Sequence, residues 1–182
     1  MGCGAPDGFP ARVFSFQTNS KEQTMAGMYY EDLEPGSVVE HAIRRTVTET
    51  DNLLFSAMTY NCAPLHIDAE YCKTSIYGQR LVNSMFLLAL VAGITVYETT
   101  LGTTLGNLGF QEIKFPKPTF HGDTIRVRTE ILDRRLSKKR NDSGIVTFKH
   151  VALNQRDEIV VECTRVGLML TREGAKAQAQ QA

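Results

Sequence analysis

The most distinctive pattern in the sequence is a run from Ser84 to Val96 that is apolar at nearly every position. A helix without a polar face is buried on several sides, so this run predicts a long central helix. Upstream, Val38 to Val47 has the composition of a strand. Thr48 then marks a helix start, because it suits the N-cap position and acidic residues follow it in the first turn.

The helix that begins after Thr48 carries one apolar stripe, and Pro64 interrupts the regular pattern beyond it. We therefore expect a loop from Asn61 to Asp68, followed by a short helix from Glu70 to Ser75. The stripe consists of Leu53, Leu54, Ala57 and Met58.

Four later segments are rich in Val, Ile, Phe and Thr in strand-like alternation, and turn residues separate them. One strand, several helices and then four strands indicate an α+β domain. An antiparallel sheet wrapped around the long central apolar helix would bury that helix, so the pattern predicts a hot-dog fold. The four segments are Gly106–Phe115, Thr124–Asp133, Ile145–Asn154 and Ile159–Leu170.

The two ends of the chain differ from this body in composition. Residues 1–27 are rich in Gly, Pro, Ser, Thr and Gln and are expected to form a poorly ordered leader, so that Met25 or Met28 is an alternative start. Residues 174–182 are rich in Ala and Gln and are expected to form a flexible tail. A single domain is predicted between them, over residues 28–173.

Composition and charge narrow the class of function. The chain has 182 residues, and its 20 Lys and Arg residues balance 20 Asp and Glu residues. This balance gives no bulk attraction to nucleic acid or to an anionic membrane, and we expect neither as a partner. The apolar run from Leu81 to Tyr97 is at the short limit for a membrane span and contains polar residues. Because no secretory signal is visible, we expect a cytoplasmic protein.

The cysteines do not have the spacing of a metal site or of a disulfide framework. Zinc sites use at least three ligands at short regular spacings, and no CxxC is present. We therefore predict no metal and expect reduced thiols. The four cysteines are Cys3, Cys62, Cys72 and Cys163.

The densest cluster of reactive groups runs from Tyr60 to Asp68 and contains His66. An imidazole changes protonation near neutral pH, so it can accept and donate a proton within one turnover. A loop bent at Pro64 would bring the amide of Asn61 beside the imidazole, where it can hold a water or a carbonyl but cannot act as a base. Residue chemistry alone leaves a second reading open, in which His66 is bonded to nearby backbone.

Three motifs resemble those of the MaoC-like dehydratase family, which includes the R-specific enoyl-CoA hydratases. Residues Phe55–Asp68, which contain Asn-Cys-Ala-Pro-Leu-His-Ile-Asp, resemble the signature Asp-x-Asn-Pro-x-His-x-Asp. Residues Tyr77–Met85 stand where the family has Val-His-Gly-Met at the start of its central helix. Residues Phe115–Ile125 resemble its Phe-x-x-Pro segment ending in Gly-Asp-Thr. The motifs occur in family order over roughly residues 29–171.

The resemblance implies hydration or dehydration of an enoyl-CoA thioester, with no cofactor other than the CoA of the substrate. It makes His66 the catalytic histidine and puts Asn61 where the family has its catalytic aspartate. The Asn followed by Pro-Leu-His is similar to the branch that handles mesaconyl-CoA and related small branched or dicarboxylic acyl-CoA substrates. Two alternatives stay open: a hot-dog acyl-CoA thioesterase, and a non-catalytic acyl-CoA-binding subunit, which the loss of the aspartate favours.

The start of the central helix is the second candidate region. Backbone amides at a helix N-terminus stabilise a developing oxyanion, so Asn83, Ser84 and Met85 are candidate substrate-binding residues. A plain N-cap at Asn83 or Ser84 explains the same residues equally well. We also assign Tyr60, from the His66 cluster, to the substrate site.

Two weaker signals concern the CoA moiety. Gly109 ends a glycine-rich stretch that would admit a pantetheine chain or merely pack against the helix. The basic run from Arg134 to Arg140 would meet phosphates or form a solvated turn. We also expect at least a homodimer with its sites near the interface, because a lone hot-dog unit leaves a sheet edge exposed.

Overall fold

The computed structural model describes residues 27–180. Short helices and strands come first along the chain, then the central helix, and then four long strands, as predicted. In chain order they are η1 (Tyr30–Asp32), β1 (Val38–Glu40), β2 (Arg45–Thr46), α1 (Glu49–Met58), α2 (Pro64–Ile67), α3 (Ala69–Lys73), α4 (Ser84–Ile94), the π-helical η2 (Val96–Thr100), β3 (Thr104–Lys114), β4 (Thr124–Leu136), β5 (Ser143–Leu153), β6 (Ile159–Leu170) and α5 (Arg172–Ala179).

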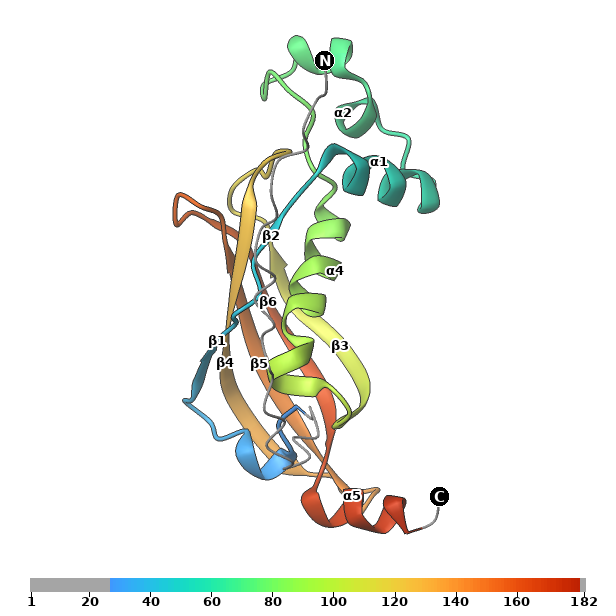
Figure 1. Ribbon diagram of the computed structural model, residues 1–182, viewed down its shortest axis with the longest axis vertical. Helices are drawn as coiled ribbons and strands as arrows, with labels where there is room; N and C mark the ends of the chain where they lie inside the picture. Colours follow the sequence, from blue (N-terminus) through green and yellow to red (C-terminus); the bar gives the residue numbers. More distant parts are fainter. Residues whose placement is uncertain (1–26, 181–182) are drawn as a thin grey trace, which may run out of the picture.

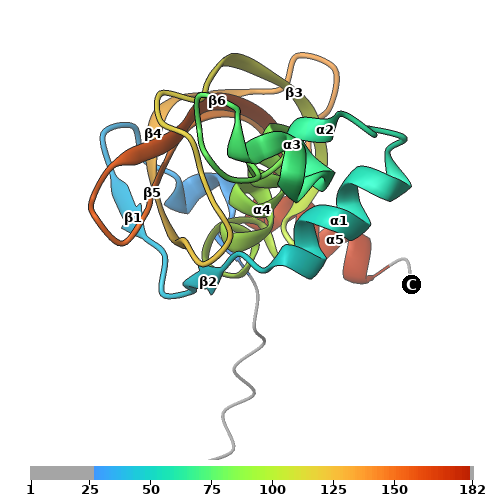
Figure 2. The same ribbon diagram turned by 90° about the horizontal axis from the view of Figure 1, so that it is seen from above.

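The strands form one antiparallel sheet in the order β1-β4-β5-β6-β3, and β2 also pairs with β4. Seen from above, this sheet curves around α4 (Figure 2). The predicted hot-dog arrangement is therefore confirmed. Strand β3 forms one margin of the sheet, where its outer edge has no partner within residues 27–180.

The apolar side chains of α4 meet the concave face of the sheet and form the main core. Leu87, Val91 and Ile94 are buried on α4 and pack with a cluster from β4, β5 and β6. The predicted burial of α4 on several sides is only partly correct, because Met85, Ala89 and Gly93, spaced one helical turn apart, are exposed on another face of the helix. The sheet residues of the cluster are Ile125, Val127, Ala152, Val160 and Val161.

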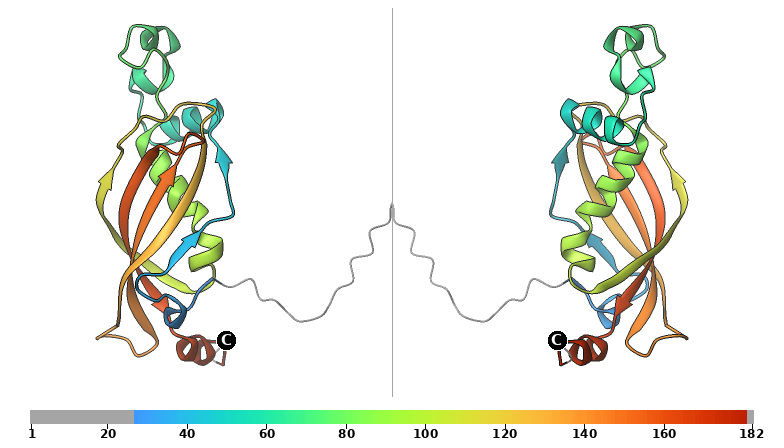
Figure 3. Two further views of the ribbon diagram at one scale, coloured as in Figure 1. Left: turned by 90° about the vertical axis from the view of Figure 1, so that its left-hand side faces the viewer. Right: turned by 90° about the vertical axis from the view of Figure 1, so that its right-hand side faces the viewer.

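The two ends of the molecule differ. Helices α1, α2 and α3 lie together beyond one end of the sheet, next to the N-terminus of α4 (Figures 1 and 3). Helix α5 and the β4–β5 hairpin lie at the other end (Figure 1). The segment that contains His66 is thus held apart from the sheet and close to the first turn of α4.

The prediction of one continuous strand over residues 38–47 was wrong. The structure has two short strands, β1 and β2, with a break between Glu40 and Arg45. The side chain of Glu98 explains the break. Its carboxylate accepts a hydrogen bond from the backbone amide of Ala42 at 3.1 Å and bonds the ring of His41 at 3.0 Å. The amide of Ala42 is therefore not available for a sheet ladder.

Helix α1 begins at Thr48 as predicted, since the Thr48 hydroxyl accepts from the amide of Asp51 in a capping box. The apolar stripe that the sequence shows on this helix is not its buried face. Leu54 and Met58 are 58% and 77% exposed, whereas the buried residues of α1 are polar. Those buried residues, Asn52 and Ser56, lie one helical turn apart.

The predicted loop over residues 61–68 contains the helical turn α2, because Pro64 occupies the first helical position, where its missing N–H has no cost. At the ends of the chain, residues 1–26 of the predicted leader lie outside the described residues. Gly27 and Met28 donate backbone hydrogen bonds to Leu101 and Thr99. Part of the predicted tail belongs to α5, which extends to Ala179.

Candidate active site

His66 lies in α2, half-buried, and its ring is fixed by one hydrogen bond. The distance from Nδ1 to the backbone oxygen of Leu81 is 2.9 Å. A carbonyl oxygen can only accept, so Nδ1 carries the proton and Nε2 of the neutral ring has a free lone pair. Leu81 lies just before α4. This bond therefore fixes both the tautomer of His66 and its place beside the start of α4.

Asn61 does not bond to His66. Its side-chain oxygen instead accepts from the amide of Ala63 at 3.3 Å, which closes the turn that leads into α2. Asn61 lines a mainly apolar hollow of about 440 Å³, here called the α1 hollow, together with Tyr60, which is 95% exposed. The α1 hollow is lined by Leu53, Ser56, Ala57, Tyr60, Asn61, Cys62 and Ile67.

The backbone amides at the start of α4 differ in whether they already have a hydrogen-bond partner. Asn83 is the N-cap, and its side chain accepts from the amide of Met85 at 3.0 Å. The amide of Asn83 itself donates to the side chain of Asn52 at 2.8 Å. Of the three predicted oxyanion donors, only the amide of Ser84 has no partner within residues 27–180.

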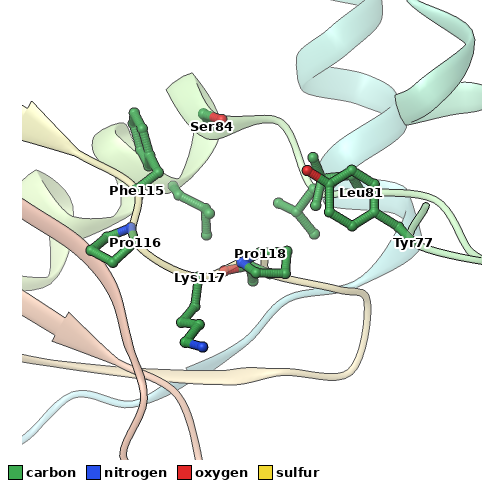
Figure 4. Close-up of a pocket in the computed structure, with 10 residues that line it drawn as sticks. Tyr77, Leu81, Ser84, Phe115, Pro116, Lys117 and Pro118 are labelled. Carbon is green, nitrogen blue, oxygen red and sulfur yellow. The ribbon is translucent and has the colours of Figure 1, made fainter. Parts of the chain in front are cut away.

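Ser84 lines a second hollow of about 220 Å³, here called the α4 hollow. Figure 4 shows it with Phe115 and Pro116 on one side and Leu81 and Tyr77 on the other. Ser84 and Asn61 therefore line two different hollows, and His66 is a lining residue of neither; Leu81, whose carbonyl bonds His66, lines the α4 hollow. The α4 hollow is lined by Tyr77, Leu81, Val82, Ser84, Leu87, Phe115, Pro116, Lys117, Pro118 and Thr119.

Sequence reasoning missed the buried polar face of α1. The amide nitrogen of Asn52 lies 3.0 Å from the backbone oxygen of His66 and 3.0 Å from Nε2 of His121. One turn later, the hydroxyl of Ser56 accepts a hydrogen bond from the side-chain nitrogen of Asn83 at 3.3 Å. The only signal in the sequence was two polar residues at helical spacing, which is also typical of a solvent-exposed face.

The described part of the chain contains no group of side chains that could bind a metal ion. Within residues 27–180, no three His, Cys, Asp or Glu side chains come together as ligands. In the same part of the chain, no helix has the length and apolarity that a membrane crossing requires.

Comparison with known proteins decides the family. Residues 32–153, more than half of the chain, match the family model described as a MaoC like domain. The chain belongs to the MaoC-like family. This result confirms the resemblance that the three sequence motifs indicated.

Among curated relatives, the mesaconyl-CoA hydratase of Cereibacter sphaeroides is 29% identical over 153 residues, which are 84% of this chain and 44% of that protein. The (R)-specific enoyl-CoA hydratase of Rhodospirillum rubrum is 26% identical over 66% of this chain and 78% of its own length. A solved MaoC-like dehydratase from Rhodospirillum rubrum has a TM-score of 0.70 at 28% identity, covering 80% of this chain and 99% of that one. The MaoC-like chain thus spans less than half the length of the first of these relatives.

Not every predicted residue of the MaoC-like site lies near His66. Gly109 lies on the margin strand β3, at a register shift against β6 and with a φ of 151°. The basic run from Arg134 lies at the β4–β5 hairpin, at the end of the molecule opposite to α2 (Figure 1). There the guanidinium of Arg134 donates to the carbonyl groups of Tyr30 and Glu31.

The MaoC-like domain also contains a chain of polar groups that runs from η2 to the sheet strands β4 and β5. His41 connects Glu98 to the hydroxyl of Thr129, which lies 2.8 Å from Nδ1 of His150. His150 is fully buried, and its Nε2 has no partner among the described residues. Burial, with a smaller effect of the nearby charge of Arg165, lowers the pKa of His150 to about 3. This ring is therefore neutral at physiological pH.

Proposed function

We propose that this chain adds water to the double bond of an enoyl-CoA thioester, or removes it in the reverse reaction. The observation that carries the proposal is the hydrogen bond from Nδ1 of His66 to the carbonyl of Leu81. In the neutral ring this bond leaves the lone pair on Nε2, the atom that would act as the general base. The membership of the MaoC-like family supports the same reaction, since relatives carry the names hydratase and dehydratase.

In the hydration direction, Nε2 of His66 takes a proton from water while the hydroxide oxygen bonds to the β-carbon of the enoyl group. The electron pair of the double bond moves toward the thioester, which becomes an enolate. The same imidazole, now protonated, returns its proton to the α-carbon. All atoms of the water end in the product, and His66 is restored.

The enolate oxygen needs a donor, and the free amide of Ser84 at the first turn of α4 supplies it in this proposal. The helix dipole adds to the stabilisation of a negative charge there. Asn61 stands where the family has an aspartate. An amide can orient the water but cannot accept its proton, so His66 performs both proton transfers alone.

The substrate that we propose is a small branched or dicarboxylic acyl-CoA, such as mesaconyl-CoA. Its support is the likeness to the mesaconyl-CoA hydratase of Cereibacter sphaeroides and the Asn-Cys-Ala-Pro-Leu-His sequence that ends at His66. The α1 hollow has a mostly apolar lining, which suits a short acyl group next to Asn61.

A non-catalytic acyl-CoA-binding subunit is the second candidate, because Asn61 replaces the acidic residue. A thioesterase has less support from the site. The carboxylates that would activate water have other partners: Asp68 accepts from the amide of Tyr71 at 2.9 Å, and Glu70 forms an ion pair with Lys73 at 2.6 Å.

The test is to incubate the purified protein with crotonyl-CoA, mesaconyl-CoA and a saturated acyl-CoA, and to follow both the enoyl absorbance and the release of free CoA. We expect enoyl absorbance to fall with the wild type and not with His66→Ala. If the wild type is silent and Asn61→Asp gains activity, the binding subunit is the better description. Release of CoA from the saturated substrate would support the thioesterase.

A further inference from the structure

We propose that Asn52 is the positioning residue of this site and that its side chain sets the separation between His66 and the first turn of α4. The inference deepens the proposed hydration reaction, and its consequence for turnover rests on that function. Its structural part stands independently, because it concerns four hydrogen bonds around one fully buried amide.

The bonds of Asn52 determine how its amide is oriented. The backbone amide of Asn83 can only donate, so the atom that faces it at 2.8 Å is the side-chain oxygen. The amide nitrogen therefore faces the carbonyl of His66 and Nε2 of His121, each at 3.0 Å. His121 must accept this bond and is neutral. Burial, together with the charge of Arg80, lowers the pKa of His121 and favours the same state.

One side chain thus contacts both parts of the proposed catalytic machinery. The carbonyl of Leu81, which accepts the hydrogen bond from Nδ1 of His66, also lies 3.4 Å from the side-chain nitrogen of Asn52. The oxygen of Asn52 meanwhile binds the N-cap of α4, next to the free amide of Ser84. A shift of Asn52 would change the position of the general base relative to the oxyanion donor.

The surroundings of Asn52 make it a stiff connection. It lies in the first half of α1, whose N-terminus is capped by Thr48, and one turn later Ser56 holds the side chain of Asn83 at 3.3 Å. Asparagine is a poor helix former, and burying its amide is costly unless every polar atom is bonded. The hydrogen bonds of Asn52 hold the His66 segment and the start of α4 in one alignment. Packing of α1 alone would need only apolar side chains at this position.

The chain offers a matched control in Asn154, which is also fully buried. Its side chain bonds only within the β5–β6 turn, to Arg156 and Glu158. Asn52→Ala and Asn154→Ala each remove one buried asparagine with several hydrogen bonds, so both variants lower the melting temperature. Only the first removes contacts to His66, Leu81 and Asn83.

Two readouts separate positioning from general stability. The first is turnover of the best enoyl-CoA substrate, for which we expect kcat of Asn52→Ala to fall about 10- to 100-fold at nearly unchanged KM. The second is the ring-nitrogen NMR spectrum of His66, in which we expect the wild type to show the proton on Nδ1. We expect this signal to shift toward a mixture of tautomers in Asn52→Ala. Asn154→Ala should retain wild-type kcat and the wild-type His66 signal.

The outcomes are distinct. An unchanged His66 signal in a folded Asn52→Ala protein overturns the inference, as does an equal loss of kcat in Asn154→Ala. If the wild type hydrates no enoyl-CoA, the proposed function fails, while the His66 spectrum still decides the role of Asn52. If Asn52→Ala does not fold, Asn52→Asp replaces it, because Asp keeps the acceptor for Asn83 and loses both donors; the same shift is then expected.

Discussion

At the scale of single residues, the amide hydrogen of Ser84 can be removed without disturbing its helix. Ser84 is the first residue of α4, where proline is tolerated, and Asn83 before it has the extended backbone (φ −60°, ψ 124°) that proline favours. We expect Ser84→Pro to lower kcat about 100-fold at an unchanged melting temperature, as loss of an oxyanion donor does. Ser84→Ala, which keeps the amide, is the control and should retain activity. Equal activity of both variants would exclude Ser84 as the donor.

His150 gives the domain a pH dependence of stability. Its pKa is about 3 in the folded protein, against an ordinary value of 6.5 for histidine, so the unfolded chain takes up the proton first as the pH falls. The free energy of unfolding is therefore highest above about pH 6.5 and decreases progressively down to about pH 3. At pH 5 it is lower by about 2 kcal/mol. Urea unfolding at pH 7.5 and pH 5 measures it. The difference between the two pH values should be smaller in His150→Gln; an equal difference would contradict this assignment.

His66, Asn61 and the start of α4 could be named as candidates from the sequence because these residues belong to local motifs. It did not locate Asn52, since the four contacts of this residue come from segments up to 69 positions away. Nor could it show that the amide of Asn83 is already bonded. Both facts depend on how α1 packs on the loop before α4, which no local pattern encodes. The bond to the amide of Met85, in contrast, comes from the side chain of Asn83 and agrees with the N-cap that the sequence offered.

At the scale of elements, α1 supports the site through its N-terminal cap. Thr48 and Asp51 exchange hydrogen bonds, with the Thr48 amide 2.8 Å from the Asp51 carboxylate and the Asp51 amide 3.2 Å from the Thr48 hydroxyl. We expect Thr48→Ala to lower the free energy of unfolding by about 1 kcal/mol. Thr48→Ser, which keeps a capping hydroxyl, should lose much less. Chemical denaturation of the three proteins measures the effect, and equal losses would contradict the capping role.

The long elements were predictable, and so was the short helix α3 (Ala69–Lys73), but the helical turn α2 and the break between β1 and β2 were not. Strands β4 and β6 begin at the predicted residues, Thr124 and Ile159, because alternation and turn residues both define them. The apolar stripe of α1 is largely exposed, since a stripe shows that a face is apolar but not what covers it. The break between β1 and β2 depends on Glu98, more than 50 residues away, and is invisible in a local pattern.

At the scale of the whole molecule, the margin strand β3 offers a surface for a second copy. Its outer edge is unpaired within the described residues, and Leu108 on it is 54% exposed. Such an edge favours pairing with another strand. We expect a homodimer, and light scattering coupled to gel filtration should give about half the wild-type mass for Leu108→Lys. Val38→Lys, at the opposite margin, is the control and should remain dimeric; a monomeric wild type would contradict the proposal.

The candidate site comes from two stretches of the chain, Thr48 to Leu87 and Phe115 to His121. Helices α1, α2 and α3 of the first stretch lie beyond the end of the sheet (Figure 3). The four long sheet strands, from Thr104 onward, build most of the scaffold. Exchanging the two stretches between family members is therefore expected to transfer substrate preference while leaving the fold to the recipient.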